Sequence, residues 1–161
     1  MKKNKLICIA VTVFCLIFIW INSPALSSDS ITWYRYKEGM ELGKKDQKKV
    51  FLYFYSDWCR YCKDMEKITF KDRAVIDLLN SGFIPVKVNT DKEKGAANEY
   101  NVSGLPSNWF IAEKGENISN LPGYIPPSKL IFILKYIQTD SYKSMTFKSY
   151  LKNLMASEKS R

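Results

Sequence analysis

The feature that most constrains this chain is a Cys-x-x-Cys pair that directly follows a long apolar run. Residues 50–55 are all apolar or aromatic, as expected for a strand that is covered on both faces of a sheet. Ser56-Asp57-Trp58 then leads to Cys59 and Cys62, at the predicted start of a helix. Cysteines three positions apart on a helix lie on one face of its first turn, close enough to form a disulfide bond.

The position of each cysteine predicts a different role for its sulfur. At a helix N-terminus the unpaired N–H groups and the helix dipole favour an anion, so Cys59 is expected to ionise more readily than an ordinary thiol, whose pKa is about 8.5. Cys62 lies one turn further and is expected to be more buried. We therefore predict that Cys59 attacks a partner's sulfur and that Cys62 resolves the mixed disulfide.

Other uses of a Cys-x-x-Cys pair fit the sequence less well. A disulfide that closes a four-residue loop constrains the unfolded chain little, which disfavours a purely structural role. A zinc site usually needs four Cys or His ligands, whereas this chain has no His and only two further cysteines, Cys8 and Cys15. We expect no metal site and no cofactor. Delivery of Cu(I) by the two thiolates is the alternative outside redox chemistry.

The first 27 residues have the composition of a targeting segment. Three lysines within the first five residues precede an apolar run over residues 6–21, and small residues around Ala25 suit a signal peptidase. We predict that residues 1–27 are a signal peptide that is removed. The alternative is a membrane anchor through residues 6–21, because this run is only slightly shorter than a span of about 17–25 residues. Either reading places the folded part in the periplasm or cell envelope.

The chain is basic, with a formal net charge of +9, and loss of residues 1–27 would remove three lysines and no acids. The lysines are spread through the sequence, without an Arg cluster interleaved with aromatic residues. We therefore expect a solvated surface and no binding of nucleic acid. After cleavage only Cys59 and Cys62 would remain. In a compartment where cysteines usually stabilise proteins, such a close pair is more plausibly kept for exchange.

The hydrophobic pattern predicts an α/β domain with the element order β-α-β-α-β-β-α, preceded by a short extended segment and an amphipathic helix within residues 31–48. The predicted strands are 50–55, 83–88, 108–112 and 118–121, and the predicted helices are 59–70, 72–79, 95–100 and 127–137. This order gives a mixed sheet with helices on both faces. We expect this domain to cover residues 28–140, followed by a helical extension over residues 141–161.

Several separated motifs resemble the thioredoxin superfamily. They are Asp57-Trp58-Cys59-x-x-Cys62-Lys63-x-x-Glu66-x-x-Thr69-Phe70-x-Asp72, Asn89-x-Asp91 and Tyr100-Asn-Val-x-Gly-Leu-Pro106. Over roughly residues 33–138 the chain is similar to exported thioredoxin-like thiol:disulfide interchange proteins, such as the C-terminal domain of DsbD and SoxW-type proteins. The resemblance implies a thioredoxin fold, with a central mixed sheet of four to five strands, and thiol:disulfide oxidoreductase activity.

The resemblance also implies roles for residues around the two cysteines. Pro106 matches the family's cis-proline, which lies against the disulfide and leaves the preceding backbone, here Leu105, free to pair with a substrate strand. The alternative for Pro106 is an ordinary trans proline in a turn. Trp58 would shield the site, and the alternative for Trp58 is plain core packing. The dipeptide Arg60-Tyr61 matches no familiar member, and Arg60 is expected to stabilise a neighbouring thiolate and so make the disulfide more oxidising.

Two residues bear on proton transfer. Glu66 lies four residues after Cys62 on the same helical face; if it is partly buried, its pKa would be raised and it could accept the Cys62 proton. The alternative for Glu66 is a surface ion pair with a lysine. Tyr53 stands where thioredoxins have a buried Asp, and it is an uncertain substitute because a phenol has a pKa of about 10.

The implied activity is reduction of disulfides in cell-envelope proteins such as cytochrome maturation factors. The chain has no Gly-rich dinucleotide-binding motif, so its electrons are expected from a membrane partner. An oxidase or isomerase with the same chemistry is the alternative within the family.

Overall fold

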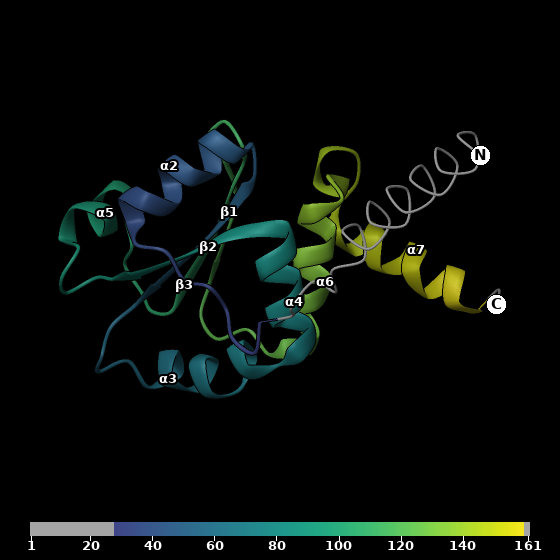
Figure 1. Ribbon diagram of the computed structural model, residues 1–161. Coiled ribbons are helices and arrows are strands. Elements are labelled where there is room, and N and C mark those ends of the chain that lie inside the picture. The colour runs from purple at the N-terminus through teal and green to yellow at the C-terminus, as the bar shows by residue number, and fades with distance from the viewer. Residues whose placement is uncertain (1–27, 160–161) are drawn as a thin grey trace, which may run out of the picture.

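The computed structural model describes residues 28–159 (Figure 1), so the predicted signal peptide or anchor at residues 1–27 lies outside the described residues. The helices and strands follow the predicted order. They are α2 (Tyr36–Asp46), β1 (Lys49–Tyr55), α3 (Arg60–Lys67), the 3-10 helix η1 (Thr69–Lys71), α4 (Arg73–Gly82), β2 (Phe83–Asn89), α5 (Lys94–Glu99), β3 (Ser107–Ile111), β4 (Asn117–Pro122), α6 (Pro127–Gln138), the 3-10 helix η2 (Ser141–Lys143) and α7 (Phe147–Lys159).

These strands form one mixed sheet in the order β2-β1-β3-β4. β1 pairs parallel with β2 and antiparallel with β3, and β4 returns antiparallel to β3. At the outer edge of β2, Tyr34 adds one isolated parallel bridge to Val86. The predicted mixed sheet with helices on both faces is thereby confirmed, with four strands.

Each face of β1 contributes to a separate core, which explains its unbroken apolar run. Phe51 and Tyr53 point to one face, where α3, α4 and α6 cover the sheet, while Val50, Leu52 and Phe54 point to the other, covered by α2 and α5. Figure 1 shows α2 and α5 on the side of the sheet away from α3. Because successive side chains alternate across a strand, a strand buried on both faces needs apolar residues at every position.

The helix α2 contacts the sheet through glycines rather than through large side chains. Gly39 and Gly43 are its buried residues. A Cβ atom at Gly39 would clash with Val86 Cγ2, and one at Gly43 would lie 2.6 Å from Val50 Cγ2. Larger residues would push the helix off the sheet. Aromatic and aliphatic side chains of this helix, such as Met40, are half-buried and pack against the same core.

The helix after the cysteines is shorter than predicted. α3 ends at Lys67 instead of continuing to Phe70, and η1 turns the chain so that Thr69 and Phe70 are buried. The Thr69 hydroxyl donates a hydrogen bond of 2.7 Å to the carbonyl of Ile125, which lies just before α6. The turn therefore places the end of α3 on the core, a tertiary contact that the helical spacing alone does not indicate.

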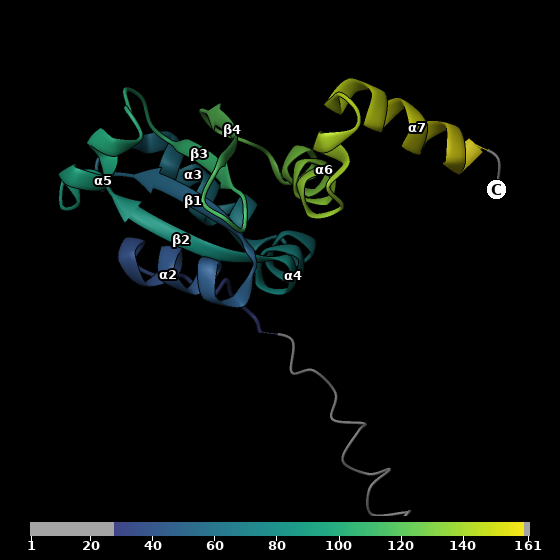
Figure 2. The same cartoon turned by 90° about the horizontal axis from the view of Figure 1, so that it is seen from above.

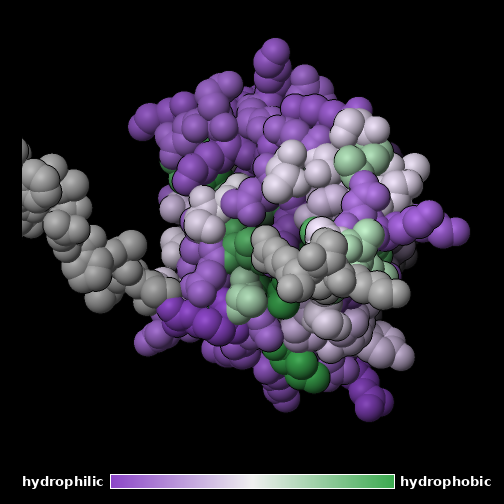
Figure 3. All heavy atoms as spheres, turned by 90° about the vertical axis from the view of Figure 1, so that its right-hand side faces the viewer, coloured by the Kyte–Doolittle hydropathy of each residue, from purple (hydrophilic) through white to green (hydrophobic). Residues whose placement is uncertain are grey.

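The C-terminal segment forms the predicted extra helix. The first turn of α7 packs on α6, where the Tyr136 ring contacts Phe147 and Tyr150, each with ring centroids 5.3 Å apart. The Thr146 hydroxyl accepts a 3.2 Å hydrogen bond from the N–H of Ser149, as expected of a helix cap. From there α7 runs outward past α6, away from the sheet (Figure 2). Figure 3 shows this side of the molecule, with apolar patches among polar residues.

None of the helices in the described part of the chain combines the length and the apolar character needed to span a membrane.

Candidate redox site

The two cysteines form a disulfide bond at the carboxyl end of β1. Their Cα atoms are 5.3 Å apart, and Cys59 is 5% exposed whereas Cys62 is 1% exposed. β1 ends at Tyr55, and a short loop brings the chain to Cys59 immediately before α3. The parallel strand β2 ends at the same edge of the sheet. The pair thus lies where a buried strand, a helix N-terminus and a neighbouring loop meet.

Cys59 is the N-cap residue of α3. Its Sγ atom accepts a hydrogen bond of 3.1 Å from the backbone N–H of Cys62, while its own backbone is extended. A sulfur in this position receives one of the unpaired N–H groups of the helix, together with the positive end of the helix dipole. When the disulfide is reduced, the same geometry stabilises a Cys59 thiolate over the thiol.

Two aromatic side chains beside the disulfide are left in solvent. Trp58 is 71% exposed and Tyr61 is 62% exposed, although both belong to types that usually bury much of their surface. Trp58 therefore does not have the core-packing role that was its alternative. Arg60, between the cysteines, is exposed as well. Around the sulfurs the molecule presents an apolar and cationic surface rather than a closed cavity.

The loop that follows β2 holds the cysteine loop in place. The Trp58 indole N–H donates to Asp91 Oδ2 at 3.1 Å, and the Asn89 side-chain amide donates to Asp57 Oδ1 at 3.2 Å. Lys92 lies 3.5 Å from the other oxygen of Asp57. Asn89 and Asp91 were not predicted as site residues. The only signal in the sequence was the Asn89-x-Asp91 spacing quoted with the resemblance.

Tyr53 lies beneath the pair and bonds to it. The side chain is fully buried, and its hydroxyl donates a hydrogen bond of 3.2 Å to the backbone carbonyl of Cys62. Burial, followed by the nearby Glu66 carboxylate and Tyr55, raises the pKa of Tyr53 far above its ordinary value. Tyr53 stays protonated at neutral pH, so it acts as a hydrogen-bond donor and not as a proton acceptor.

Glu66 is in an ion pair at the edge of the site. Its Oε1 atom lies 2.9 Å from Lys87 Nζ on β2, with the Glu66 side chain 36% exposed. The same ammonium group lies 4.2 Å from the centroid of the Tyr55 ring, and this ring stacks on Tyr53. The ion pair with a lysine is therefore present. A part for Glu66 in proton transfer stays a prediction.

Leu105 and Pro106 lie directly before β3, and the peptide bond between them is cis. The Pro106 carbonyl accepts a hydrogen bond of 2.7 Å from the N–H of Gly123, at the far end of β4. Two residues on, the buried Asn108 amide donates to the carbonyls of Leu121 and Gly123. These bonds fix the loop before β3 to the chain that leaves β4.

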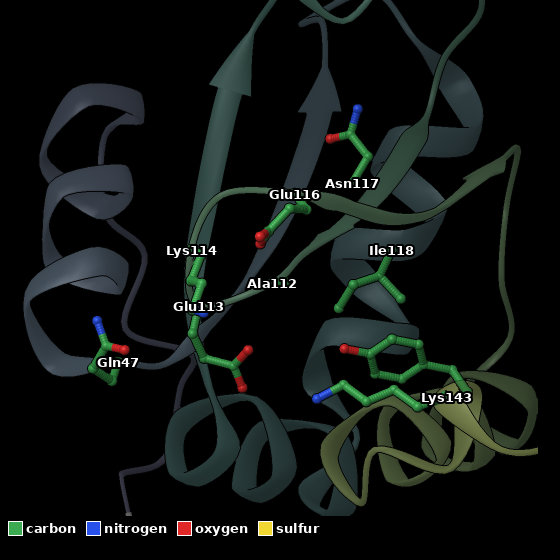
Figure 4. Close-up of a pocket in the computed structure, with 9 residues that line it drawn as sticks. Gln47, Ala112, Glu113, Lys114, Glu116, Asn117, Ile118 and Lys143 are labelled. Atoms are coloured by element: carbon green, nitrogen blue, oxygen red, sulfur yellow. The ribbon is translucent and has the colours of Figure 1, made fainter.

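Away from the disulfide, the residues that could form other sites are few. Within residues 28–159, no three His, Cys, Asp or Glu side chains come together in a way that could hold a metal ion. A hollow of about 740 Å³ lies between the β3–β4 hairpin and the C-terminal segment, with Glu113 and Lys143 on its walls (Figure 4). Neither cysteine lines this hollow. It lies next to the start of β1, where Lys49 pairs with Glu113 of the hairpin, whereas the disulfide follows the opposite end of that strand.

The chain is similar to known thioredoxin-like proteins. The family model described as a thioredoxin-like domain matches residues 36–138. The thiol:disulfide interchange protein DsbD of Haemophilus ducreyi is 33% identical over 103 residues, which are 62% of this chain and 18% of that protein. The chloroplastic thioredoxin Y of rice (Oryza sativa subsp. japonica) is 32% identical over 91 residues, 56% of this chain and 52% of that protein. The chain therefore spans about a fifth of the length of the DsbD protein it matches.

Solved structures show the same fold. A thioredoxin from Thermus thermophilus superposes with a TM-score of 0.61 at 29% identity, over 67% of this chain and 87% of that one. The C-terminal domain of DsbD from Neisseria meningitidis, in its oxidised form, gives a TM-score of 0.55 at 24% identity, over 62% of this chain and 90% of that one. On the match over residues 36–138, the chain belongs to the family of thioredoxin-like domains, and it carries a disulfide at the N-terminus of α3.

Proposed function

We propose that this chain is exported and reduces disulfide bonds in proteins of the cell envelope. The position of Cys59 supports this proposal most directly: its sulfur sits at the N-cap of α3, hydrogen-bonded to the Cys62 N–H. A thiolate held there is a nucleophile near neutral pH. Export is inferred from the composition of residues 1–27 and from the resemblance to exported members of the family.

In the proposed reaction the reduced enzyme starts with a Cys59 thiolate. This thiolate attacks one sulfur of the partner's disulfide; that S–S bond breaks, and the partner's other sulfur leaves and takes a proton. Cys62 then loses its proton and attacks Cys59 Sγ, which releases the second partner sulfur as a thiol. The partner has gained two electrons and two protons, and the enzyme ends as the Cys59–Cys62 disulfide.

Residues around the sulfurs would bind the partner and manage the proton. Trp58 and Tyr61 offer exposed aromatic surface, Arg60 offers a positive charge, and the loop at Leu105 and Pro106 would receive the partner's backbone. Glu66 would accept the Cys62 proton, since it follows Cys62 by one helical turn and Tyr53 stays protonated. To act again, the enzyme needs two electrons from a donor, which we place in the membrane.

The equilibrium reduction potential of the Cys59–Cys62 couple tests the direction of electron flow. The couple would be equilibrated in dithiothreitol or glutathione buffers and the fraction of disulfide measured by thiol labelling and mass spectrometry. A potential near that of thioredoxin, about −270 mV, is the expected result for a reductant. A potential near that of DsbA, about −120 mV, would instead identify an oxidase and overturn the proposed direction.

A further inference from the structure

The helix α7 has an apolar face whose aromatic contacts with α6, within the described residues, lie in its first turn. Phe147 and Tyr150 pack against Tyr136 of α6. Further along, Leu151 and Leu154 are half-buried, and Met155 is 67% exposed. These residues recur at spacings of three and four, so they share one face of the helix. The helix itself runs on beyond its contact with α6 (Figure 2), so the shared face extends past that contact.

Lysines border this face along one side. Lys148 and Lys152 are exposed, and they lie seven and three residues before Met155, which puts all three on one line along the helix. In the sequence, Lys159 continues the spacing. Lysine side chains are long enough to hold their charge in water while the neighbouring apolar side chains enter a nonpolar phase. Met155 between lysines is the pattern of a helix that binds at the interface of an anionic membrane.

The helix is too short to cross a bilayer and long enough to lie on one. Its 13 residues extend about 20 Å, compared with about 30 Å for the hydrocarbon core of a membrane. A second copy of the chain is a less suitable partner for this face of α7, because the lysines of both copies would then lie close together and repel each other. Phospholipid headgroups carry the opposite charge and can accept both the lysines and the apolar residues.

The described chain also begins at this end of the molecule. Asp29 pairs with Arg73 at 3.2 Å, and the Asn80 side chain binds the backbone of Ser30 and Thr32, so the start of the domain is tied to α4. α4 packs against α6, on which α7 rests. The first described residues therefore lie beside α4, which packs against α6.

We propose that α7 binds along the surface of an anionic lipid bilayer, through Met155 and its flanking lysines Lys148 and Lys152. This orients the redox site. Lys49, at the start of β1, binds Asp140, which lies between α6 and α7, whereas Cys59 follows the other end of the strand. A strand of seven residues is roughly 23 Å long, so the disulfide faces away from the bilayer, toward partners in solution.

Hydrogen–deuterium exchange of the full chain, followed by mass spectrometry, tests this proposal without relying on redox activity. Vesicles of phosphatidylcholine with about 30% phosphatidylglycerol would be compared with vesicles of phosphatidylcholine alone. The expected result is exchange slowed about 10-fold across the second half of α7 with the anionic vesicles only. Residues 1–27 are the same in the native chain and in the variants below, so a difference in protection between these variants does not come from an anchor there.

Two matched variants of the full chain distinguish the face of α7 from net charge. Lys148→Gln with Lys152→Gln removes two positive charges beside Met155, and each lysine near an anionic surface is worth about a fivefold change in affinity, so binding should weaken about 25-fold. Ser149→Asp with Asn153→Asp lowers the net charge by the same amount on the opposite face and should keep most of the protection. Circular dichroism would verify that both variants retain the helix.

Three outcomes would overturn the proposal. One is unchanged exchange in α7 with anionic vesicles. Another is equal loss of protection in both double variants, which would mean that net charge alone drives binding. The third is protection without vesicles that grows with protein concentration, which would assign the face to a second copy of the chain.

Discussion

The two ends of β1 both gather charged and aromatic residues, yet they differ in what those residues can do. At the carboxyl end, Trp58, Arg60 and Tyr61 surround the disulfide and are open to solvent. At the other end, Lys49 is 7% exposed by its side chain and lies 2.7 Å from Glu113 and 3.1 Å from Asp140. One end leaves its groups available to a partner, and the other end pairs them within the fold.

The difference shows that burial and pairing, not residue type, separate the two roles. Burial alone would lower the pKa of Lys49, but its hydrogen bonds to Glu113 and Asp140 more than offset this and raise the pKa. That ammonium group stays charged and joins the hairpin after β3 to the segment after α6. The sulfurs at the other end are held by one helix N–H and can exchange.

The largest expected effect is at the reactive end. Cys59→Ser should lower the rate of disulfide reduction by at least about 100-fold, because a serine hydroxyl does not supply the thiolate nucleophile. Cys62→Ser should still attack but should accumulate the mixed disulfide, which mass spectrometry can detect. Turnover of an insulin substrate by Cys59→Ser close to that of the native chain would contradict the assignment of the nucleophile.

A substitution of Lys49, at the start of β1, should lower the stability of the fold without changing the rate of disulfide reduction. Lys49→Met is expected to lower the free energy of unfolding by about 1–3 kcal/mol, because it strips two carboxylates of their shared buried partner while both keep some access to water. Urea unfolding measures the loss, with the exposed neighbour Lys48→Met as the control. A drop in the reduction rate of folded Lys49→Met would break the proposed separation of the two ends.

Glu66→Gln probes proton transfer at the reactive end. If Glu66 accepts the Cys62 proton, resolution of the mixed disulfide should slow by about 10-fold and its dependence on pH should change. The cost in stability should stay below about 1 kcal/mol, since the ion pair with Lys87 is partly exposed. Stopped-flow kinetics would compare the rate of resolution in Glu66→Gln with that in Asp64→Asn, a substitution on the same helix. Equal rates in the two variants would mean that Glu66 only forms a surface ion pair.

A smaller effect is expected at Tyr53, which lies between the core and the disulfide. Tyr53→Phe removes the hydrogen bond to the Cys62 carbonyl and should cost about 1 kcal/mol of stability. Because burial keeps the Tyr53 pKa far above neutral pH, the pH profile of disulfide reduction should not shift. A shifted profile would show that the phenol takes part in proton transfer.

The smallest expected effect is a pH dependence of the stability that Lys49 and its two carboxylate partners contribute. Hydrogen bonds from Lys49 lower the pKa of Glu113, and those from Lys143 and Lys49 lower that of Asp140. Because these two pKa values are lower in the folded state than in the unfolded chain, the stability that they contribute is complete above about pH 4.5. This stability is lost as the pH falls from there through the lowered pKa values of the folded state. The raised pKa of Lys49 gives stability that is complete below about pH 10 and is lost above.

The difference in unfolding free energy between the native chain and Lys49→Met should therefore be constant from about pH 6 to 9 and narrow outside that range. Urea titrations at several pH values would measure it. A difference that stays constant down to pH 3 would show that Glu113 and Asp140 gain nothing from Lys49.

Much of the fold could be predicted because its patterns are local. The apolar run of β1 is read from six neighbouring residues, and its continuation into a helix that opens at the cysteines comes from adjacent sequence. The end of α3 could not be predicted this way. Helical spacing continues to Phe70, but the bond from Thr69 to Ile125 and the burial of Phe70 turn the chain after Lys67.

The residues that hold the cysteine loop in place were harder to predict from the sequence than the cysteines themselves. Cys59 and Cys62 are conspicuous by spacing, whereas Asn89 and Asp91 act only because the end of β2 lies beside the end of β1. No periodicity encodes that a loop residue will bind an indole 33 positions away. Glu66 could be placed on the face of Cys62 from sequence, but its partner Lys87 lies on another strand.

By itself, the sequence determined where the cysteine pair would lie, because a strand, a helix start and a Cys-x-x-Cys spacing are properties of contiguous residues. Only the tertiary structure decided which charged residues are structural. Lys49 ends a run of charged and polar residues that looks like solvated surface, and it becomes buried because a hairpin and a C-terminal segment bring carboxylates to it. The physical reason is that the desolvation and pairing of a charge depend on partners far along the chain, which local patterns do not specify.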